Sequence, residues 1–503
     1  MALVKSGITR DYLLHHRVCP AAWDDDGALL VAAAPDALVD DALPDLETLY
    51  GCTIRVERRS PWEVERLIEH LDAAEGAHTT SLELAPAAEH DVDNGTTDVR
   101  ELATQAPVVR YVNLLVRDAY EAGASDIHLE ATRQGLIARL RLDGVLSRAT
   151  EPPHGLAGAV VSRVKLLAEL DIAERRRPQD GRIRVRLEAR ELDLRVSSVP
   201  TLFGESVVLR LLDRGGRPVS LSELGMPTEV YTSTARLAAR PHGMVLVTGP
   251  TGSGKTTTLY SALQQRETTA EKIITVEDPI EYELAGITQV PVHRQAGVTF
   301  AAALRSILRQ DPDVIMLGEM RDPETAEVAV QAAMTGHLVF STLHTNDALS
   351  AVPRLVDLGV PPYLLAATLE GVLAQRLVRM ICNECRTPDT PDPEMLAALQ
   401  TATRTGEPDV GGNTGCDGGA EPRFARGAGC PSCRQTGFRG RIGLFELVTV
   451  TDALRAATAS RAPLAELQRL ATAACMRPLA VDGLAKVRSG ITTVEEVLRV
   501  IQQ

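Results

Sequence analysis

The sequence has few aromatic residues, no excess of basic residues and no long apolar run. Aromatic residues make up 3% of its 503 residues, so its cores must rest on Leu, Val, Ile and Ala. Lys and Arg number 53 against 67 Asp and Glu, a formal net charge of −14. This balance disfavours a protein that wraps nucleic acid through bulk charge. The scarcity of aromatic side chains also disfavours a translocase that stacks single-stranded bases.

Targeting signals are equally scarce. No stretch approaches the roughly 20 apolar residues that a membrane-spanning helix needs. Residues 1–10 lack the charged-then-apolar order of a signal peptide. We therefore expect a cytoplasmic protein that is peripheral at a membrane and reaches it only through partners.

A chain of 503 residues is too long for one core, and it predicts about two to four domains. Residues 1–75 mix short apolar runs with a helical-looking stretch at 61–71, and they predict a small α/β module. Residues 76–100 are polar and predict a linker. In residues 101–213 apolar and polar positions alternate in three runs, which predicts a half-buried antiparallel sheet.

The second half of the chain has a different pattern. Residues 221–380 alternate apolar strands with helices, which is typical of a parallel sheet covered by helices. Residues 381–440 have a loop-like composition and contain paired cysteines. Residues 441–503 are predicted to be helical, with a capping box at Thr493–Glu496 opening the last helix.

A glycine-rich loop follows the apolar strand 244–248 and precedes a helical pattern at 259–263. It fits the phosphate-binding pattern GxxxxGK[ST], in which glycines let backbone N–H groups point at phosphate oxygens. A glycine-rich turn is the alternative, but the strand and helix on either side argue against it. We expect Lys255 to reach the β- and γ-phosphates of ATP and Thr256 to ligate Mg²⁺. The predicted nucleotide-binding residues are Gly249, Pro250, Thr251, Gly252, Ser253, Gly254, Lys255, Thr256 and Thr257.

Two other apolar strands end in carboxylates. Residues 313–319 resemble a Walker B strand, which would place Glu319 where it positions Mg²⁺ or polarises the attacking water. Glu277 ends the strand 272–276 and is a candidate general base. The alternatives are an exposed acid after a buried strand for Glu319 and a polar turn at Asp278-Pro279 for Glu277.

Histidines flank the apolar run 338–340. His337 precedes it, and His344 follows it in the sequence Thr-Leu-His-Thr-Asn. A strand that ends in such polar residues beside an ATP site can sense a γ-phosphate, although a single histidine is often structural. We include His344 among the candidate catalytic residues.

The chain has eight cysteines, and four of them form two CxxC pairs. Such pairs supply four thiolates that can complete a tetrahedron around a structural Zn²⁺. The segment between the pairs, 386–429, is longer than the usual spacing of about 15–20 residues. Free thiols are the alternative, and Cys416 within the segment is expected to be a spectator. The predicted zinc ligands are Cys382, Cys385, Cys430 and Cys433.

These motifs together resemble the secretion ATPases, a superfamily that includes type II secretion and type IV pilus motors. The resemblance covers about residues 100–450 and includes the P-loop, the segments 274–282, 317–322 and 335–346, and the four cysteines. The segments 241–249 and 371–379 are more similar to the type II secretion ATPase than to the pilus extension ATPase. Met320 replaces the usual Ile of the Walker B box.

The resemblance implies an α/β fold, in which a sensor-like domain is followed by a RecA-like P-loop ATPase domain with a tetracysteine zinc insert. It implies a homo-hexamer that hydrolyses ATP with Mg²⁺ and drives an inner-membrane platform, without nucleic acid, to assemble a pseudopilus and export proteins. It also implies that Arg195 and Arg210 of the sensor-like domain act at the nucleotide, and the alternative is that they alternate outward into water. A type IV pilus motor, a nucleic-acid translocase and a non-hydrolysing scaffold remain alternatives.

Overall fold

The computed structural model describes residues 16, 18–23, 28–35, 37, 39–50, 52–59, 64, 106–152, 155–187, 190–213, 219–403 and 423–502. Three separate sheets carry most of its strands, and a two-stranded ribbon lies in the cysteine-containing segment. No helix among the described residues is both long and apolar enough to cross a membrane.

The first sheet is small. Its order is β1 (Val18–Trp23), β2 (Leu29–Ala33) and β3 (Ile54–Arg58), and the helix α2 (Val39–Tyr50) precedes β3. Its core includes Leu29, Val31 and Leu46, all almost fully buried. The predicted helical stretch 61–71, apart from Val64, and the predicted linker 76–100 lie outside the described residues.

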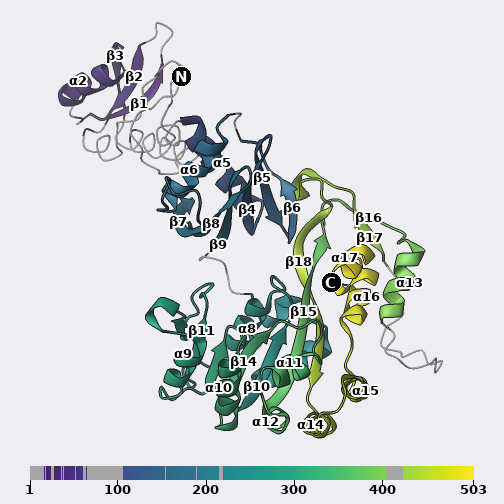
Figure 1. Ribbon diagram of the computed structural model, residues 1–503. Helices are drawn as coiled ribbons and strands as arrows, with labels where there is room; N and C mark the ends of the chain where they lie inside the picture. The colour runs from purple at the N-terminus through teal and green to yellow at the C-terminus, as the bar shows by residue number, and fades with distance from the viewer. Residues whose placement is uncertain are drawn as a thin grey trace. The chain divides into compact units, whose positions relative to one another are not determined.

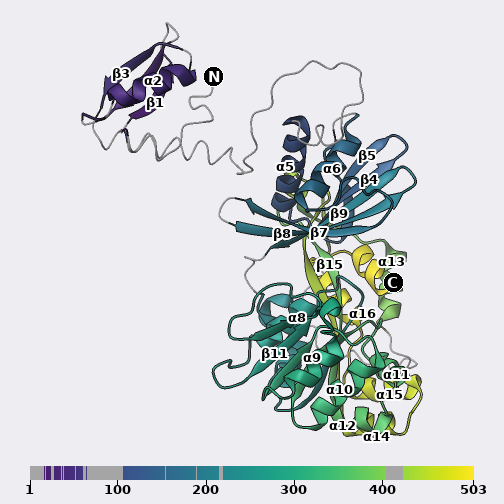
Figure 2. The same cartoon turned by 60° about the vertical axis from the view of Figure 1, so that its left-hand side comes forward.

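The second sheet has six strands in the order β6-β5-β4-β9-β8-β7. The pairs β4–β5, β4–β9 and β5–β6 are antiparallel, as the alternation of apolar and polar residues predicts. The helix α5 (Ala106–Glu121) precedes β4 in the chain and α6 (Ala157–Leu167) lies between β6 and β7 in the sequence, and Figure 2 labels both helices. The strands span Asp126–Thr132 (β4), Gly135–Leu142 (β5), Val145–Arg148 (β6), Gln179–Leu187 (β7), Arg190–Thr201 (β8) and Gly204–Asp213 (β9).

The third sheet has seven strands in the order β12-β11-β13-β14-β10-β15-β18. All of its neighbours are parallel except β15 and β18, which pair antiparallel. The parallel part was expected from the sequence, whereas β18 joins it from beyond the cysteine-containing segment. The strands span Gly243–Thr248 (β10), Ile273–Glu277 (β11), Thr288–Pro291 (β12), Val314–Leu317 (β13), Leu338–Leu343 (β14), Leu369–Ile381 (β15) and Phe438–Thr449 (β18).

Helices cover both faces of this sheet (Figure 1). One apolar core joins the sheet to α7 (Thr228–Ala238) and α8 (Lys255–Leu263). The core on the other face draws its residues from α9 (Phe300–Ile307), α10 (Pro323–Met334), α11 (Ala351–Asp357), α12 (Pro362–Thr368), α14 (Asp452–Ala459) and α15 (Leu464–Ala473). The four central strands are buried on both sides, which explains their continuous apolar runs.

The segment between β15 and β18 has more regular structure than its loop-like composition predicts. It contains β16 (Arg386–Pro388), α13 (Pro393–Ala402) and β17 (Ala425–Gly427), of which β16 and β17 pair. Residues 404–422, including Cys416, lie outside the described part of the chain.

The chain ends in α16 (Leu479–Arg488) and α17 (Val494–Ile501), which pack on β15 and β18 through a shared apolar core. The Thr493 side chain accepts the backbone N–H of Glu496, so half of the predicted capping box is present. The other half is absent, because the Glu496 carboxylate instead accepts from Arg379 on β15 at 2.6 Å and from Arg499 at 2.9 Å.

Candidate nucleotide-binding and metal sites

The glycine-rich loop lies at the carboxyl edge of the seven-stranded sheet, between β10 and α8. This edge, where the parallel strands end together, is where such sheets bind their ligands. The first N–H groups of α8 have no acceptor within the helix, so they can donate to an anion. The Ser253 hydroxyl is buried in the loop and has no hydrogen-bond partner among the described residues. A hydroxyl group without a hydrogen-bond partner, beside the N-terminus of a helix, fits a phosphate ligand.

Lys255 begins α8, and its ammonium group is satisfied by the loop itself. Its Nζ donates to the carbonyl oxygens of Gly249 at 2.7 Å and Pro250 at 3.0 Å. Burial lowers the pKa of Lys255 to about 8, against the opposing effect of Glu319. The lysine thus lies in the loop where phosphate oxygens can replace the two carbonyl oxygens.

Glu319 follows β13 and lies between Arg321 of its own segment and His344, which follows the neighbouring strand β14. Its Oε2 lies 2.6 Å from Arg321 Nε and 3.7 Å from His344 Nε2. Burial lowers the pKa of His344, and nearby Lys255 adds to this effect while Glu319 opposes it. The structure therefore brings three predicted site residues, Lys255, Glu319 and His344, within electrostatic range of one another.

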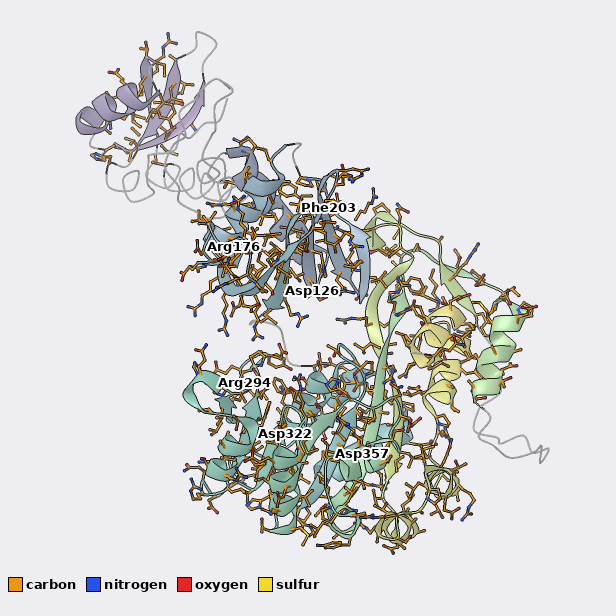
Figure 3. All side chains as sticks on the ribbon, in the orientation of Figure 1. Asp126, Arg176, Phe203, Arg294, Asp322 and Asp357 are labelled. Atoms are coloured by element: carbon orange, nitrogen blue, oxygen red, sulfur yellow. The ribbon has the colours of Figure 1, made fainter. Side chains whose placement is uncertain are left out.

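The strand ends around Glu319 are held by hydrogen bonds. Thr342 on β14 donates its hydroxyl to the Gly318 carbonyl at 2.7 Å and accepts the Met320 N–H on its own carbonyl at 3.1 Å. Asp322 then caps α10, with its side chain accepting the Thr325 N–H at 2.8 Å (Figure 3). Glu319 is thus fixed between a buried strand and a capped helix.

Glu277 ends β11 and is almost fully buried. Its Oε1 accepts from Thr275 Oγ1 at 2.5 Å and from Gln289 Nε2 at 3.1 Å, and its Oε2 accepts from the Tyr260 hydroxyl. Burial, and this hydrogen bond to Glu277, raise the pKa of Tyr260. One lone pair on Oε2 remains for a further donor.

Sequence reasoning missed the partners of Glu277. Tyr260 belongs to the helix that follows the P-loop, and Gln289 lies on β12 at the edge of the sheet. No motif marks either residue, because their role arises from the packing of α8 and β12 beside β11. Asp278, the next residue, forms an ion pair with Arg294 at 3.2 Å.

Arg195 and Arg210 lie on β8 and β9 of the six-stranded sheet. Arg210 Nε donates to Asp126 Oδ1 on β4 at 2.9 Å, while most of its side chain remains exposed. Figure 3 labels Asp126 in this sheet.

The four predicted zinc ligands converge. Their sulfur atoms all lie within 4.8 Å of one another. The Sγ–Sγ separation is 3.8 Å for Cys382–Cys430 and for Cys385–Cys433, and 3.6 Å for Cys430–Cys433. A tetrahedral zinc with Zn–S bonds of about 2.3 Å requires S–S separations of about 3.8 Å. The spacing therefore fits a tetrahedral metal.

Backbone N–H groups around Cys433 favour its thiolate form. Cys433 Sγ accepts the N–H groups of Cys430 at 3.2 Å and Gly437 at 3.3 Å. Burial opposes these donors, and the balance lowers the pKa of Cys433 to about 6. Gly427 and Gly437 approach so closely that a Cβ on Gly427 would lie 1.9 Å from the Gly437 carbonyl oxygen. The four cysteines bring together the two ends of the segment that connects β15 to β18.

Comparison with known proteins identifies the fold and the family. A model of the family described as type II/IV secretion system protein matches residues 101–499. The chain belongs to the type II/IV secretion system protein family. Members of this family are secretion ATPases of the P-loop superfamily, in agreement with the phosphate-binding loop.

Individual family members are similar over most of the chain. Type II secretion system protein E of Pseudomonas aeruginosa is 47% identical over 84% of this chain and 81% of its own length. The type IV pilus assembly ATPase PilB of Myxococcus xanthus is 42% identical over 94% of this chain and 82% of its own length. The crystal structure of the pilus retraction motor PilT with bound ADP has 28% identity and a TM-score of 0.51, and the match covers 77% of this chain and 95% of PilT.

Proposed function

We propose that this chain hydrolyses ATP to power protein export by a type II secretion system, as the subunit of a homo-hexamer. The observation that carries the proposal is the cluster of Lys255, Glu319 and His344 around a P-loop with an orphaned Ser253 hydroxyl. The identity to a type II secretion protein E supports the choice of system. The main alternative is type IV pilus assembly, because a pilus assembly ATPase is also similar over most of the chain.

In the proposed mechanism the P-loop backbone holds the phosphates of ATP, and Lys255 exchanges its carbonyl acceptors for β- and γ-phosphate oxygens. Mg²⁺, when bound at Thr256, would neutralise developing phosphate charge. Glu319 orients or polarises the attacking water, with His344 beside it sensing the γ-phosphate. Glu277 is the candidate general base, because its Oε2 keeps one lone pair for a water proton.

Arg195 and Arg210 are proposed to act at the nucleotide, as the family resemblance implies. A guanidinium placed at the γ-phosphate stabilises the charge of the transition state. Cleavage then removes the charge that held the arginine, which would couple hydrolysis to movement. The exposed fraction of the Arg210 side chain leaves donors available for this role.

The cysteine cluster is proposed to hold one structural Zn²⁺. The S–S separations, and the N–H donors to Cys433, support this choice of metal.

We also propose that residues 1–75 dock the motor to the cytoplasmic part of an inner-membrane platform protein. That would place the chain in the cytoplasm, at the periphery of the inner membrane.

Complementation of a strain that lacks the gene tests the proposed system. Wild type should restore the release of exported enzymes into the medium, whereas Lys255→Ala and a chain without residues 1–75 should leave them in the periplasm. The deletion should keep its ATPase activity, because the P-loop lies outside it. If the loss of the gene abolished pili and left secretion intact, the pilus assembly alternative would replace this proposal.

A further inference from the structure

Two strands flank the P-loop strand and place their ends beside it. Thr248, the last residue of β10, is in register with Leu343 on β14 and with Ala374 on β15. β14 ends at Leu343, and the chain passes through His344 into the loop Thr345–Asp347, while β15 continues from Ala374 to Gln375 and Arg376. The P-loop therefore begins between this loop and the two polar residues of β15.

Arg376 connects β15 to the loop Thr345–Asp347, and its side chain is nearly fully buried. Its Nη2 donates to the Asn346 carbonyl at 2.8 Å, and its Nη1 donates to the Gln375 carbonyl at 3.2 Å. The guanidinium also packs against Gly249, where an added Cβ would lie 3.2 Å from Nη1 and 2.4 Å from the Gln375 carbonyl oxygen. One side chain thus contacts β15, the root of the P-loop and the loop after β14.

Gln375, the neighbouring residue, anchors the far end of the P-loop separately. Its Oε1 accepts the Thr258 hydroxyl of α8 at 2.6 Å, and its Nε2 would lie 2.8 Å from a Cβ on Gly254. Thr248 holds Thr345 through a hydroxyl–hydroxyl contact of 2.7 Å. Removing Arg376 would therefore release Asn346 while leaving α8, Thr345 and Asp347 tethered, because Asp347 is held by Ser350 and Thr345.

A second buried charged residue, Glu446, also contacts the segment after β14. Glu446 on β18 is in register with Ala374 and accepts the N–H groups of Ala348 at 2.8 Å and Leu479 at 3.3 Å. Leu479 opens α16, so Glu446 connects the loop after β14 to the C-terminal helices. Its charge also offsets that of Arg376. Burying such a pair costs desolvation energy that apolar residues on these strands would avoid.

We propose that Arg376 is a positioning residue for ATP turnover. It ties the root of the P-loop to Asn346, so that His344, just before the loop Thr345–Asp347, stays aligned with the bound phosphates. Glu446 ties Ala348, just after that loop, to the start of α16. The inference rests on the proposed ATPase function and adds residues outside the recognised nucleotide motifs.

Three variants of the full-length chain test this role. Arg376→Met removes the donors at similar volume, and Arg376→Lys keeps the charge with one flexible ammonium. Arg379→Met is the matched control, because Arg379 lies on the same strand but pairs with Glu496 on α17. Each is assayed for kcat and KM with Mg-ATP, for the Kd of a fluorescent ADP analogue and for thermal unfolding.

We expect Arg376→Met to lower kcat about 10- to 100-fold, with the Kd for the ADP analogue within about threefold of wild type. Arg376→Lys should recover part of the loss. Arg379→Met should lower the unfolding temperature and leave kcat within about twofold of wild type. If Arg376 were merely structural, both methionine variants would lose stability. In Arg376→Met, kcat and nucleotide affinity would then fall together.

Wild-type kcat in a folded Arg376→Met chain would overturn the inference. If that variant did not fold, Arg376→Lys would decide, since wild-type turnover in it would also count against a positioning role. The proposed function fails in a different way, through a wild-type chain that binds the ADP analogue but does not hydrolyse ATP.

Discussion

At the scale of single residues, Lys255 shows how the P-loop is built to receive phosphate. Its ammonium is held by two carbonyl oxygens of its own loop, at 2.7 and 3.0 Å. These neutral acceptors only partly replace water, which is why burial lowers the pKa of Lys255 to about 8. Anionic phosphates would favour the charged form, so nucleotide binding should take up a proton once the pH exceeds this value.

We therefore expect nucleotide affinity to weaken as the pH rises through about 8. A group whose pKa rises on binding makes the affinity fall above its pKa in the free protein. The Kd of ADP should increase about tenfold between pH 7 and pH 9, as measured by fluorescence titration. Lys255→Arg is the control, because arginine stays protonated in this range, and its Kd should be nearly independent of pH. If the Kd of ADP changed with pH to the same extent in wild type and in Lys255→Arg, the assignment of this pH dependence to Lys255 would be contradicted.

The sequence predicted the proximity of the candidate site residues better than it predicted their hydrogen-bond partners. Lys255, Glu319 and His344 follow apolar strands, and parallel strands end at one edge, so their proximity could be anticipated. The contact of Tyr260 with Glu277, and that of Arg376 with Asn346, join segments distant in the chain. Only the tertiary packing of α8 and β15 creates them.

At the scale of elements, the cysteine cluster holds together a segment with little core of its own. The described residues of this segment contribute few buried apolar side chains, among them Leu399 and Ala425. A metal would therefore supply much of the cohesion of this part of the chain.

Purified protein should contain one zinc per chain, and removing it should loosen this segment. Metal analysis under reducing, chelator-free conditions measures the content. Cys430→Ser should lose the zinc and expose the residue 382–437 region to limited proteolysis, while Cys475→Ser, at an exposed position outside the cluster, should do neither. A metal-free wild-type chain with an intact protease pattern would rule out a structural zinc.

Two features at this scale could not be predicted from local sequence. The strand β18 pairs with β15 across the whole cysteine-containing segment, a connection that no local periodicity encodes. The Glu496 carboxylate fits the capping pattern, but the half-buried Arg379 on β15 competes for it and provides a charged donor. Tertiary charge pairing outweighs the local cap.

At the scale of the whole molecule, the proposed ring predicts that active sites are shared between subunits. Arg210→Ala should remove most ATPase activity, and Arg195→Ala should reduce it less. If each site uses an arginine from a neighbouring subunit, mixing Arg210→Ala with Lys255→Ala subunits should restore part of the activity. Steady-state hydrolysis across a series of mixing ratios measures this. Mixed rings without any recovery would indicate that the arginines act within one chain or away from the nucleotide.

The central claim is that the cluster at the end of β10, β13 and β14 hydrolyses ATP, and Glu319→Gln tests it most directly. Steady-state phosphate release should be at least about 100-fold slower than in wild type, because the amide cannot activate water. Binding of a fluorescent ATP analogue should stay within about threefold, because the P-loop and Lys255 are unchanged. Wild-type turnover by Glu319→Gln would contradict this account of the site.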